Sequence, residues 1–271
     1  MNRGAILSCT VILLVLIGSV AAAESVAHRA IVITNDYEFT AENGVCSGEG
    51  TIDDPYIIEG WRIDAGFDDY GIRIHGTTRA FIIRNVEISG AAKAGIYLSY
   101  VKNGTIENCT LVANWVGVSL SFSSLIRISD CAFEQNVDGI HLYFARDNQI
   151  LGNTFSRNDT SIWLDASNEN EIIDNLIADS HMGAYLNLGS EGNRFVDNAF
   201  VDNLHNAHCD APNLWDDGTV GNYWSDFEGI DADGDGIWDS PYQIRSEGDR
   251  DNRPLMAHPR VPSPPPPTCD N

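Results

Sequence analysis

The sequence predicts an all-β fold, a parallel β-helix of about six coils closed by N- and C-terminal caps. Three observations lead to this prediction. A short motif recurs at a nearly constant step of 22 residues, a second apolar segment recurs at the same step, and apolar residues alternate with polar ones inside each copy. A unit of this length cannot bury its own apolar face, so the copies must stack on one another.

The first 23 residues have the pattern of a secretory signal peptide. Asn2 and Arg3 precede a short apolar run, and the small residues at Ala21, Ala22 and Ala23 provide a cleavage site. A membrane anchor, the alternative, needs a longer unbroken apolar span. We therefore expect a mature protein without a transmembrane anchor that is secreted or otherwise extracytoplasmic, at a cell surface or in a periplasm-like space.

The repeats are predicted over residues 67–205, after an N-terminal cap at 24–66. The motif DGIHLYF at residues 138–144 has copies that begin at residues 70, 94, 116, 160 and 182. Glycine fills the second position of every copy except the one with Ser161, and we interpret this glycine as a turn device. Ile140 and Leu142 are expected inside the coil, because they alternate with His141 and Tyr143.

Each copy also carries a polar turn whose residues align between copies. Asn114, Asn136 and Asn158 hold one such position, where amides can donate and accept hydrogen bonds along a stack. Cys109 and Cys131 hold a slot that asparagine fills in later copies. We expect two buried thiols there, and a disulfide between them is the alternative, subject to strict geometry.

The charge of the chain excludes some classes of partner. Asp and Glu outnumber Lys and Arg 39 to 16, which gives a formal net charge of −23. Such a surface repels nucleic acid and anionic membranes, so neither is an expected partner. It suits divalent cations, high salt or solubility. The cysteines are too few and too widely spread for a disulfide framework.

Alternation also predicts two outward columns on the first strand of each coil. The candidate ligand-binding residues of this face are Arg73, Tyr97, His141, Tyr143, Trp163, Asp165 and Tyr185. Aligned aromatic rings beside hydroxyl, amide and carboxylate groups are typical of surfaces that bind sugars by apolar stacking and directed hydrogen bonds. The alternative is that aromatic residues simply favour strands.

No catalytic residue is predicted on this face. A glycosidase needs two carboxyl groups about 5 to 9.5 Å apart, whereas Asp138 and Asp165 would lie roughly 15 Å apart on straight strands. Ser119, His141 and Asp165 follow the order of a catalytic triad. Stacked columns produce such arrangements by chance, however, and nothing in the sequence marks an oxyanion hole.

The segments that flank the repeats carry a family resemblance. GTIDDPYIIEGWRIDAG (50–66), WDDGTVGNYWSDFEGIDADGDGIWDSPYQI (215–244) and the repeats between them resemble the NosD-like family, also described as carbohydrate-binding and sugar-hydrolase (CASH) domains. The resemblance extends over residues 42–256 and is to archaeal surface and secreted members. It implies a right-handed, pectin-lyase-like helix. Lyase relatives imply basic residues beside calcium-binding carboxylates on the strand face, and only Arg73 meets that requirement.

The sequence thus favours a secreted β-helix that binds or scaffolds, with carbohydrate as the favoured class of ligand. Three alternatives stay open. They are a polysaccharide-active lyase or hydrolase, a structural component of the cell envelope, and a copper-handling protein of the periplasmic type, since relatives carry a copper-binding description.

The stretch DADGDGIWD, in the C-terminal cap predicted over residues 206–256, is typical of a calcium loop. The expected ligands are Asp231, Asp233, Asp235, Asp239 and the carbonyl group of Ile237. Oxygen ligands at alternate positions wrap one cation, and the two glycines permit the tight turn. The twelfth position is Tyr242, so a bidentate ligand must come from elsewhere, such as Asp226. An acidic solvated turn is the alternative.

Two further segments complete the prediction. His205, His208 and Cys209 are candidate ligands for copper or zinc, and a polar turn is the alternative. Residues 257–271 are rich in proline and predict an extended, semi-rigid tail.

Overall fold

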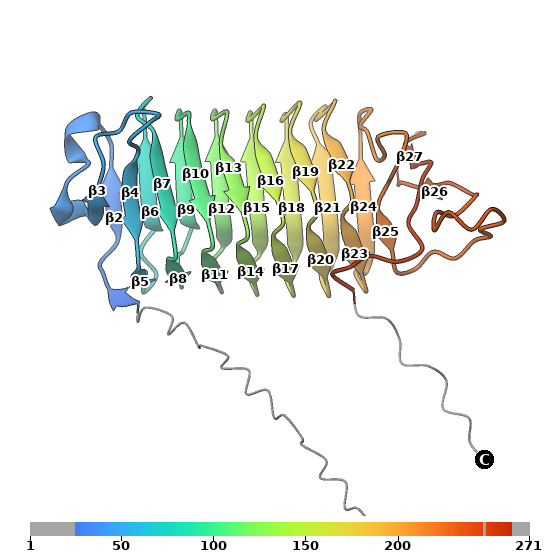
Figure 1. Ribbon diagram of the computed structural model, residues 1–271. Helices are drawn as coiled ribbons and strands as arrows, with labels where there is room; N and C mark the ends of the chain where they lie inside the picture. Colours follow the sequence, from blue (N-terminus) through green and yellow to red (C-terminus); the bar gives the residue numbers. More distant parts are fainter. Residues whose placement is uncertain (1–24, 246–247, 262–271) are drawn as a thin grey trace, which may run out of the picture.

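The computed structural model describes residues 25–245 and 248–261 and confirms a parallel β-helix. Three sheets run along the whole helix axis, and each coil contributes one strand to each sheet (Figure 1). The signal peptide predicted at residues 1–23 and most of the predicted tail lie outside the described residues. Within the described residues, no helix has the length and hydropathy needed to cross a membrane.

The first sheet carries the predicted ligand-binding columns. Its strands, in spatial order, are β2 (Ile31–Ile33), β6 (Tyr70–His75), β9 (Ala94–Ser99), β12 (Val116–Ser121), β15 (Asp138–Tyr143), β18 (Thr160–Asp165), β21 (Met182–Asn187) and β24 (His205–Cys209). The helix therefore has about eight coils rather than six. The difference arises because β2 lies inside the segment predicted as the N-terminal cap, and β24 extends past residue 205 into the predicted C-terminal cap.

The second and third sheets form the other two faces. The second sheet contains β3 (Val45–Ser47), β4 (Tyr56–Glu59), β7 (Phe81–Arg84), β10 (Gly104–Glu107), β13 (Arg127–Ser129), β16 (Gln149–Leu151), β19 (Glu171–Ile173) and β22 (Arg194–Val196). The third contains β1 (Val26–Ala27), β5 (Trp61–Asp64), β8 (Glu87–Ser89), β11 (Thr110–Val112), β14 (Ala132–Glu134), β17 (Thr154–Ser156), β20 (Leu176–Ala178), β23 (Ala199–Val201) and β25 (Tyr223–Trp224). Within these three sheets, all strand pairs are parallel except β3 with β4.

The two ends of the helix are capped differently. Two short 3-10 helices, η1 (Asp36–Glu38) and η2 (Ala41–Asn43), precede the antiparallel strand β3 at the N-terminal end. At the other end, long loops and the antiparallel pair β26 (Tyr242–Gln243) and β27 (Arg250–Asp251) follow the last coil (Figure 1). Both devices block continued strand pairing, which protects the open edges of the sheets.

The core is built from columns of like residues. Val118, Ile140 and Ile162 pair in register on neighbouring strands and are fully buried. In the third sheet, the rings of Phe133 and Phe155 stack with centroids 4.7 Å apart and planes 8° from parallel. Each fully buried side chain of this kind contributes about 1.5–3 kcal/mol to folding. The inward slots predicted from alternation are thus confirmed.

Asparagine ladders satisfy the backbone at the corners between sheets. The Oδ1 atom of Asn136 accepts from the backbone N–H of Asn114 at 2.9 Å and from its Nδ2 at 3.2 Å, and Asn158 does the same for Asn136. In a second ladder, the backbone N–H of Cys131 donates to Asn153 Oδ1 at 2.9 Å. Cys109 and Cys131 are buried free thiols, as predicted.

The repeated glycine is not a turn device, which corrects the interpretation from the sequence. A Cβ atom on Gly139 would lie 2.5 Å from the backbone oxygen of Ser161 and 2.8 Å from Phe155 Cδ1. Gly117 meets Phe133 in the same way. The glycine therefore leaves room for a phenylalanine ring and the next coil. Where Ser161 replaces glycine, the residue in the phenylalanine slot is the slimmer Ile177.

Residues 257–261 do not form the extended tail that was predicted for them. His258 is buried, and its Nε2 atom lies 2.9 Å from the backbone oxygen of Asp197. Arg260 donates two hydrogen bonds to the carboxylate of Asp174, at 3.0 and 3.1 Å. Residues up to Val261 therefore fold back onto the corner that follows β19 and β22, and belong to the folded body.

Candidate functional site

The outward side chains of the first sheet, here called the strand face, lie in the predicted columns. Tyr97 pairs with Arg73, and Trp163 pairs with both His141 and Tyr185. Tyr143 and Asp165 pair with each other in the neighbouring column. All seven predicted residues thus share one face, in the register expected from the repeat.

The rings of the strand face contact one another along the helix axis. His141 and Trp163 stack with centroids 5.1 Å apart, and Trp163 meets Tyr185 edge to face at 5.7 Å. Tyr185 in turn stacks on His208 at 5.2 Å. Ser119, which pairs with His141, interrupts this line of rings. The face therefore holds a continuous ring cluster over its C-terminal half.

Asp165 fixes two of these rings. Its Oδ1 atom accepts from the indole Nε1 of Trp163 at 2.9 Å, and its Oδ2 atom lies 3.4 Å from Nε2 of His141. Burial lowers the pKa of His141, although the charge of Asp165 acts in the opposite direction. The imidazole is therefore largely neutral near pH 7. Because Asp165 is itself 9% exposed, the two rings are held in one arrangement before any ligand arrives.

Asp138 is the most perturbed group of the strand face. Its side chain is 4% exposed, and its carboxyl group receives no hydrogen bond from the described residues. Burial, with further contributions from the charges of Asp159 and Asp165, raises its pKa to about 7. Perturbed carboxyl groups concentrate at functional sites. Ser119 makes no hydrogen bond to His141 within the described structure.

Neighbouring side chains cover part of the strand face. Tyr143 is 38% exposed, while His141, Trp163 and Tyr185 are half-buried by their neighbours. Arg73 points onto Tyr70, with its guanidinium carbon 5.7 Å from the ring centroid, and its Nε atom is buried without a hydrogen-bond partner among the described residues. Arg73, the basic residue predicted for this face, is thus held against a ring.

A second aromatic row, which the sequence reading missed, lies at the corner after the first sheet. Tyr100, Phe122 and Phe144, here called the corner ladder, directly follow β9, β12 and β15 and are 57%, 44% and 48% exposed. All three have positive φ, at 54°, 50° and 48°. The signal was present in the sequence, because these residues recur at the same 22-residue step, one position beyond each strand.

The backbone of the corner ladder is unfavourable for such residues. A non-glycine residue in the left-handed region costs about 1–2 kcal/mol. At the corner between the second and third sheets, the same conformation is taken mainly by Asn, Asp and Gly, which tolerate it: Asn85, Asn108, Asp130, Gly152, Asp174 and Asp197. Ring stacking returns about 0.5–1.5 kcal/mol per pair. The corner ladder therefore contributes little to folding and leaves apolar surface in water.

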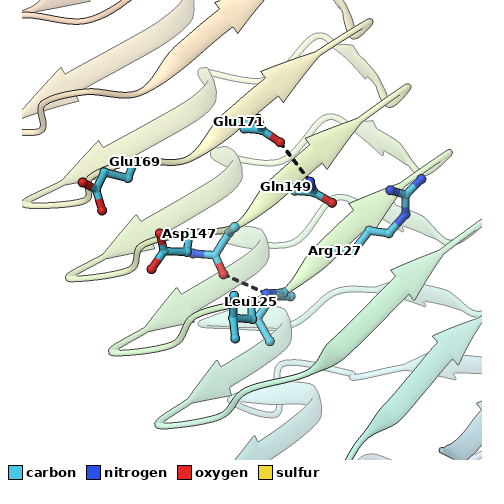
Figure 2. Close-up of a pocket in the computed structure, with 8 residues that line it drawn as sticks. Leu125, Arg127, Asp147, Gln149, Glu169 and Glu171 are labelled. Carbon is cyan, nitrogen blue, oxygen red and sulfur yellow. Dashed lines mark hydrogen bonds between the residues drawn. The ribbon is translucent and has the colours of Figure 1, made fainter. Parts of the chain in front are cut away.

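A groove of about 440 Å³ crosses the second sheet. Figure 2 shows Arg127, Gln149 and Glu171 on successive strands, and Leu125, Asp147 and Glu169 at the corners that precede them. Gln149 donates to Glu171 at 2.9 Å. The groove combines amide, guanidinium and carboxylate groups with an exposed leucine. It lies on a different sheet from the predicted face, and alternation in the first strand gave no indication of it.

The predicted calcium loop brings three of its carboxylates together. Oxygen atoms of Asp231, Asp233 and Asp235 lie within 4.8 Å of one another. Burial opposes the charge of Asp231, but N–H donation from Gly236, Gly234 and Asp235 lowers the pKa of Asp231 overall.

Two other residues considered for this loop have different contacts. Asp239 accepts from the backbone N–H of Ala232 at 3.1 Å, so it closes the loop. Asp226 does not join the cluster, because it accepts from Asn206 at 2.8 Å and from the Tyr242 hydroxyl at 3.3 Å. The suggestion that it completes the ligand set stays a prediction.

The structure separates the three predicted soft-metal ligands. His208 stacks on Tyr185 on the strand face, whereas Cys209 is buried and its thiol donates to Asp249 at 3.3 Å. His205 lies near His181, with ring centroids 5.6 Å apart. The three residues named from the sequence therefore do not form one site.

Comparison with known proteins shows the family of this chain. Residues 28–229 match the family described as "Periplasmic copper-binding protein (NosD)". The chain belongs to the NosD family. Two relatives named "Probable ABC transporter binding protein NosD" share shorter segments with it. The protein of Pseudomonas aeruginosa is 41% identical over 75 residues, or 27% of this chain and 18% of its own length. That of Stutzerimonas stutzeri is 40% identical over 73 residues, or 26% and 17%.

These NosD relatives are much longer than the segment they share with this chain, so their names do not define its activity. Two solved structures are similar in part. "The complex structure of XylC with xylose" covers 58% of this chain and 31% of its own, with 14% identity and a TM-score of 0.47. The structure of an alginate lyase from Paenibacillus covers 72% of this chain and 97% of its own, with 12% identity and a TM-score of 0.29. Nothing about ligand or activity follows from scores this low.

The NosD description raises the question of whether the donors present fit copper. Imidazole and thioether groups are good copper ligands. His181 and His205 offer two imidazoles, and Met182 pairs in register with His205 on the same sheet. Arg245 Nη1 lies 3.1 Å from His205 Nδ1 and occupies that nitrogen. Because a neutral imidazole that accepts at Nδ1 carries its own proton on Nε2, His205 could bind copper only if the contact with Arg245 is broken; His181 and Met182 would be the other donors.

Proposed function

We propose that this protein is an extracytoplasmic binding or scaffolding protein whose strand face holds carbohydrate. The observation that carries the proposal is the fixed pair of rings, His141 and Trp163, that Asp165 holds by its carboxylate. Sugars bind where apolar ring surface lies beside a few directed polar groups. Rings positioned before binding lose little conformational entropy when the ligand arrives, which favours affinity.

The test is glycan-array binding by the purified protein, followed by titration of the best-binding glycan into variants. Trp163→Ala and Tyr97→Ala should each weaken binding, because each removes a ring of the strand face. Tyr37→Ala is the matched control, since Tyr37 is 93% exposed and lies in the N-terminal cap. Absence of binding to any glycan would leave a structural role in the envelope, whereas binding that survives both variants would place the carbohydrate site away from the strand face.

Polysaccharide cleavage is an alternative that the buried acid Asp138 would serve. A carboxyl group with a pKa near 7 can donate a proton at neutral pH. Incubation with a panel of polysaccharides should produce neither new reducing ends nor unsaturated products if the protein only binds. Formation of such products by the wild type, and its loss in Asp138→Asn, would instead indicate that the protein is an enzyme.

The acidic loop suggests a structural ion. We propose that Asp231, Asp233 and Asp235 bind calcium together with the carbonyl group of Ile237, and that Asp239 supports the loop through Ala232. Three carboxylates this close repel one another unless a cation lies between them. Calcium fits oxygen ligands in an irregular loop better than magnesium does, because magnesium requires tight octahedral geometry.

A second candidate function is copper binding at the C-terminal end of the strand face. It is favoured by the contact between His181 and His205 and by the register of Met182 with His205. Titration with Cu(I) in competition with a chromophoric chelator should give one bound ion, and His181→Ala should remove it. His28→Ala, at the N-terminal end, is the control. Equal binding by both variants would exclude this site.

A further inference from the structure

The three rings of the corner ladder stack nearly parallel to one another on successive coils. Tyr100 and Phe122 stack with centroids 4.9 Å apart, and Phe122 and Phe144 with centroids 5.2 Å apart, with planes 6° from parallel in both pairs. Parallel carbon atoms in contact lie about 3.5–4.0 Å apart. Rings whose centres lie 4.9 and 5.2 Å apart are therefore not in full face-to-face contact. Part of each ring stays open to solvent, since the three residues are 57%, 44% and 48% exposed.

Polar groups and a further ring border the corner ladder on the side of the strand face. The Tyr143 ring meets Phe122 and Phe144 edge to face, at 5.6 and 4.7 Å. His75 meets the edge of Tyr100 at 5.7 Å, and its Nδ1 atom lies 2.8 Å from the Ser99 hydroxyl. Hydroxyl and imidazole groups thus lie beside a row of open ring faces. That combination suits a sugar, which offers apolar C–H faces and hydroxyl edges together.

The spacing of the rings and the net charge of the protein limit the kind of ligand that the corner ladder could bind. One ring recurs per coil, at the strand spacing of about 4.8 Å, which is close to the repeat of a linear chain of pyranose units. The net charge of −23 opposes polyanions such as nucleic acid, anionic lipid surfaces and acidic polysaccharides. The row ends after Phe144, because Ala166 holds the next corner and has no ring.

We propose that the corner ladder binds consecutive sugar units of an uncharged linear polysaccharide that lies along the helix axis. This inference deepens the carbohydrate-binding function proposed above and rests on it. It adds a second row of contacts, a direction for the bound chain and a length of about three units, one for each ring. Affinity should therefore rise steeply with chain length up to a trisaccharide or tetrasaccharide and then level off.

The left-handed backbone provides a variant that separates binding from folding. Asparagine tolerates this conformation better than phenylalanine does. Phe122→Asn should therefore keep or raise the melting temperature while it lowers affinity about tenfold, the loss of one good aromatic contact. Leu188→Asn is the matched control, because Leu188 holds the same corner with φ of 52° and is 58% exposed, but lies beyond Ala166.

The experiment is calorimetric titration of the full-length secreted protein with cello- and xylo-oligosaccharides from disaccharide to hexasaccharide. Loss of affinity in Phe122→Asn, but not in Leu188→Asn, supports the proposal, whether or not Trp163→Ala also weakens binding. Unchanged affinity in Phe122→Asn with loss in Trp163→Ala overturns the corner ladder alone. Absence of binding of both oligosaccharide series to the wild type overturns the corner-ladder proposal, while the strand-face proposal falls only if the glycan array also shows no binding. Self-association that disappears in Phe122→Asn, seen by sedimentation velocity, would make the row an interface between copies and also overturn it.

Discussion

Replacing Asp138 with asparagine should stabilise the protein at alkaline pH and much less at acidic pH. Burial of a side chain that is 4% exposed, together with the charges of Asp159 and Asp165, raises the pKa of Asp138 from 3.8 to about 7. Asparagine has nearly the same shape and cannot ionise. The variant therefore removes the cost of placing a charge at this position and leaves the packing in place.

The sign of the effect follows from proton binding. Because the pKa is higher in the folded protein than in the unfolded chain, the folded state binds the proton more tightly. The stability from this group is complete below about pH 4 and is lost as the pH rises through about 7. A shift of about three pKa units corresponds to at most about 4 kcal/mol near pH 8, and to about 1 kcal/mol near pH 4.5.

Urea unfolding curves of the wild type and of Asp138→Asn, collected from pH 4.5 to pH 8, measure this difference directly. Asp53→Asn is the control for the change in net charge, because Asp53 is exposed in the N-terminal cap. The advantage of Asp138→Asn should grow with pH, while that of the control stays small and flat. A pH-independent difference, or a variant less stable than the wild type near pH 8, would refute the reasoning and indicate a charged, partnered carboxylate.

Three other predictions use the same columns and loops. Ile140→Asp should cost several kcal/mol of unfolding free energy, because it buries an unpaired charge, whereas His141→Ala on the outward side should cost much less; equal losses in denaturant melts would contradict the inward and outward assignment. Gly139→Ala should destabilise by about 1–3 kcal/mol, since its Cβ would lie 2.5 Å from the Ser161 oxygen, and an unchanged midpoint would mean that the neighbouring coil yields. Calcium at a hundredfold excess over its Kd should stabilise the metal-stripped protein by about 2.7 kcal/mol, at constant ionic strength and more than magnesium does; a shift that survives in Asp233→Ala would show that the loop is only a solvated turn.

Much of the fold could be predicted because a β-helix repeats one local rule. A side chain that faces inward in one coil must face inward in the next, so Ile140 and Ile162 could be placed from their spacing alone. The columns of the strand face follow from the same alternation. The asparagine ladders were predictable for a related reason, since an amide that stacks on its own copy can both donate and accept.

Other features depend on geometry that spacing does not contain. The role of Gly139 depends on where the Phe155 ring points, which only the packed coils reveal. The carboxylate contacts of Asp165 depend on the side-chain rotamers of two rings on different coils. The repeat region extends further at both ends than predicted, because β2 and β24 pair with the neighbouring coils although their sequences depart from the repeat motif. Strand pairing depends on the backbone and tolerates such departures.

In a repeat fold, each column is expected to hold residues of one kind. Residues that differ from the rest of their column are therefore candidates for a function. Asp138 breaks a column of uncharged residues, between Val116 and Thr160, and is buried there with a raised pKa. Tyr100, Phe122, Phe144 and Leu188 place large apolar side chains at left-handed corners, a conformation that Asn, Asp and Gly tolerate better. Both departures lower or fail to improve stability, and both border the strand face. If the protein binds carbohydrate as proposed, variants on the strand face and on the corner that adjoins it should separate binding from stability.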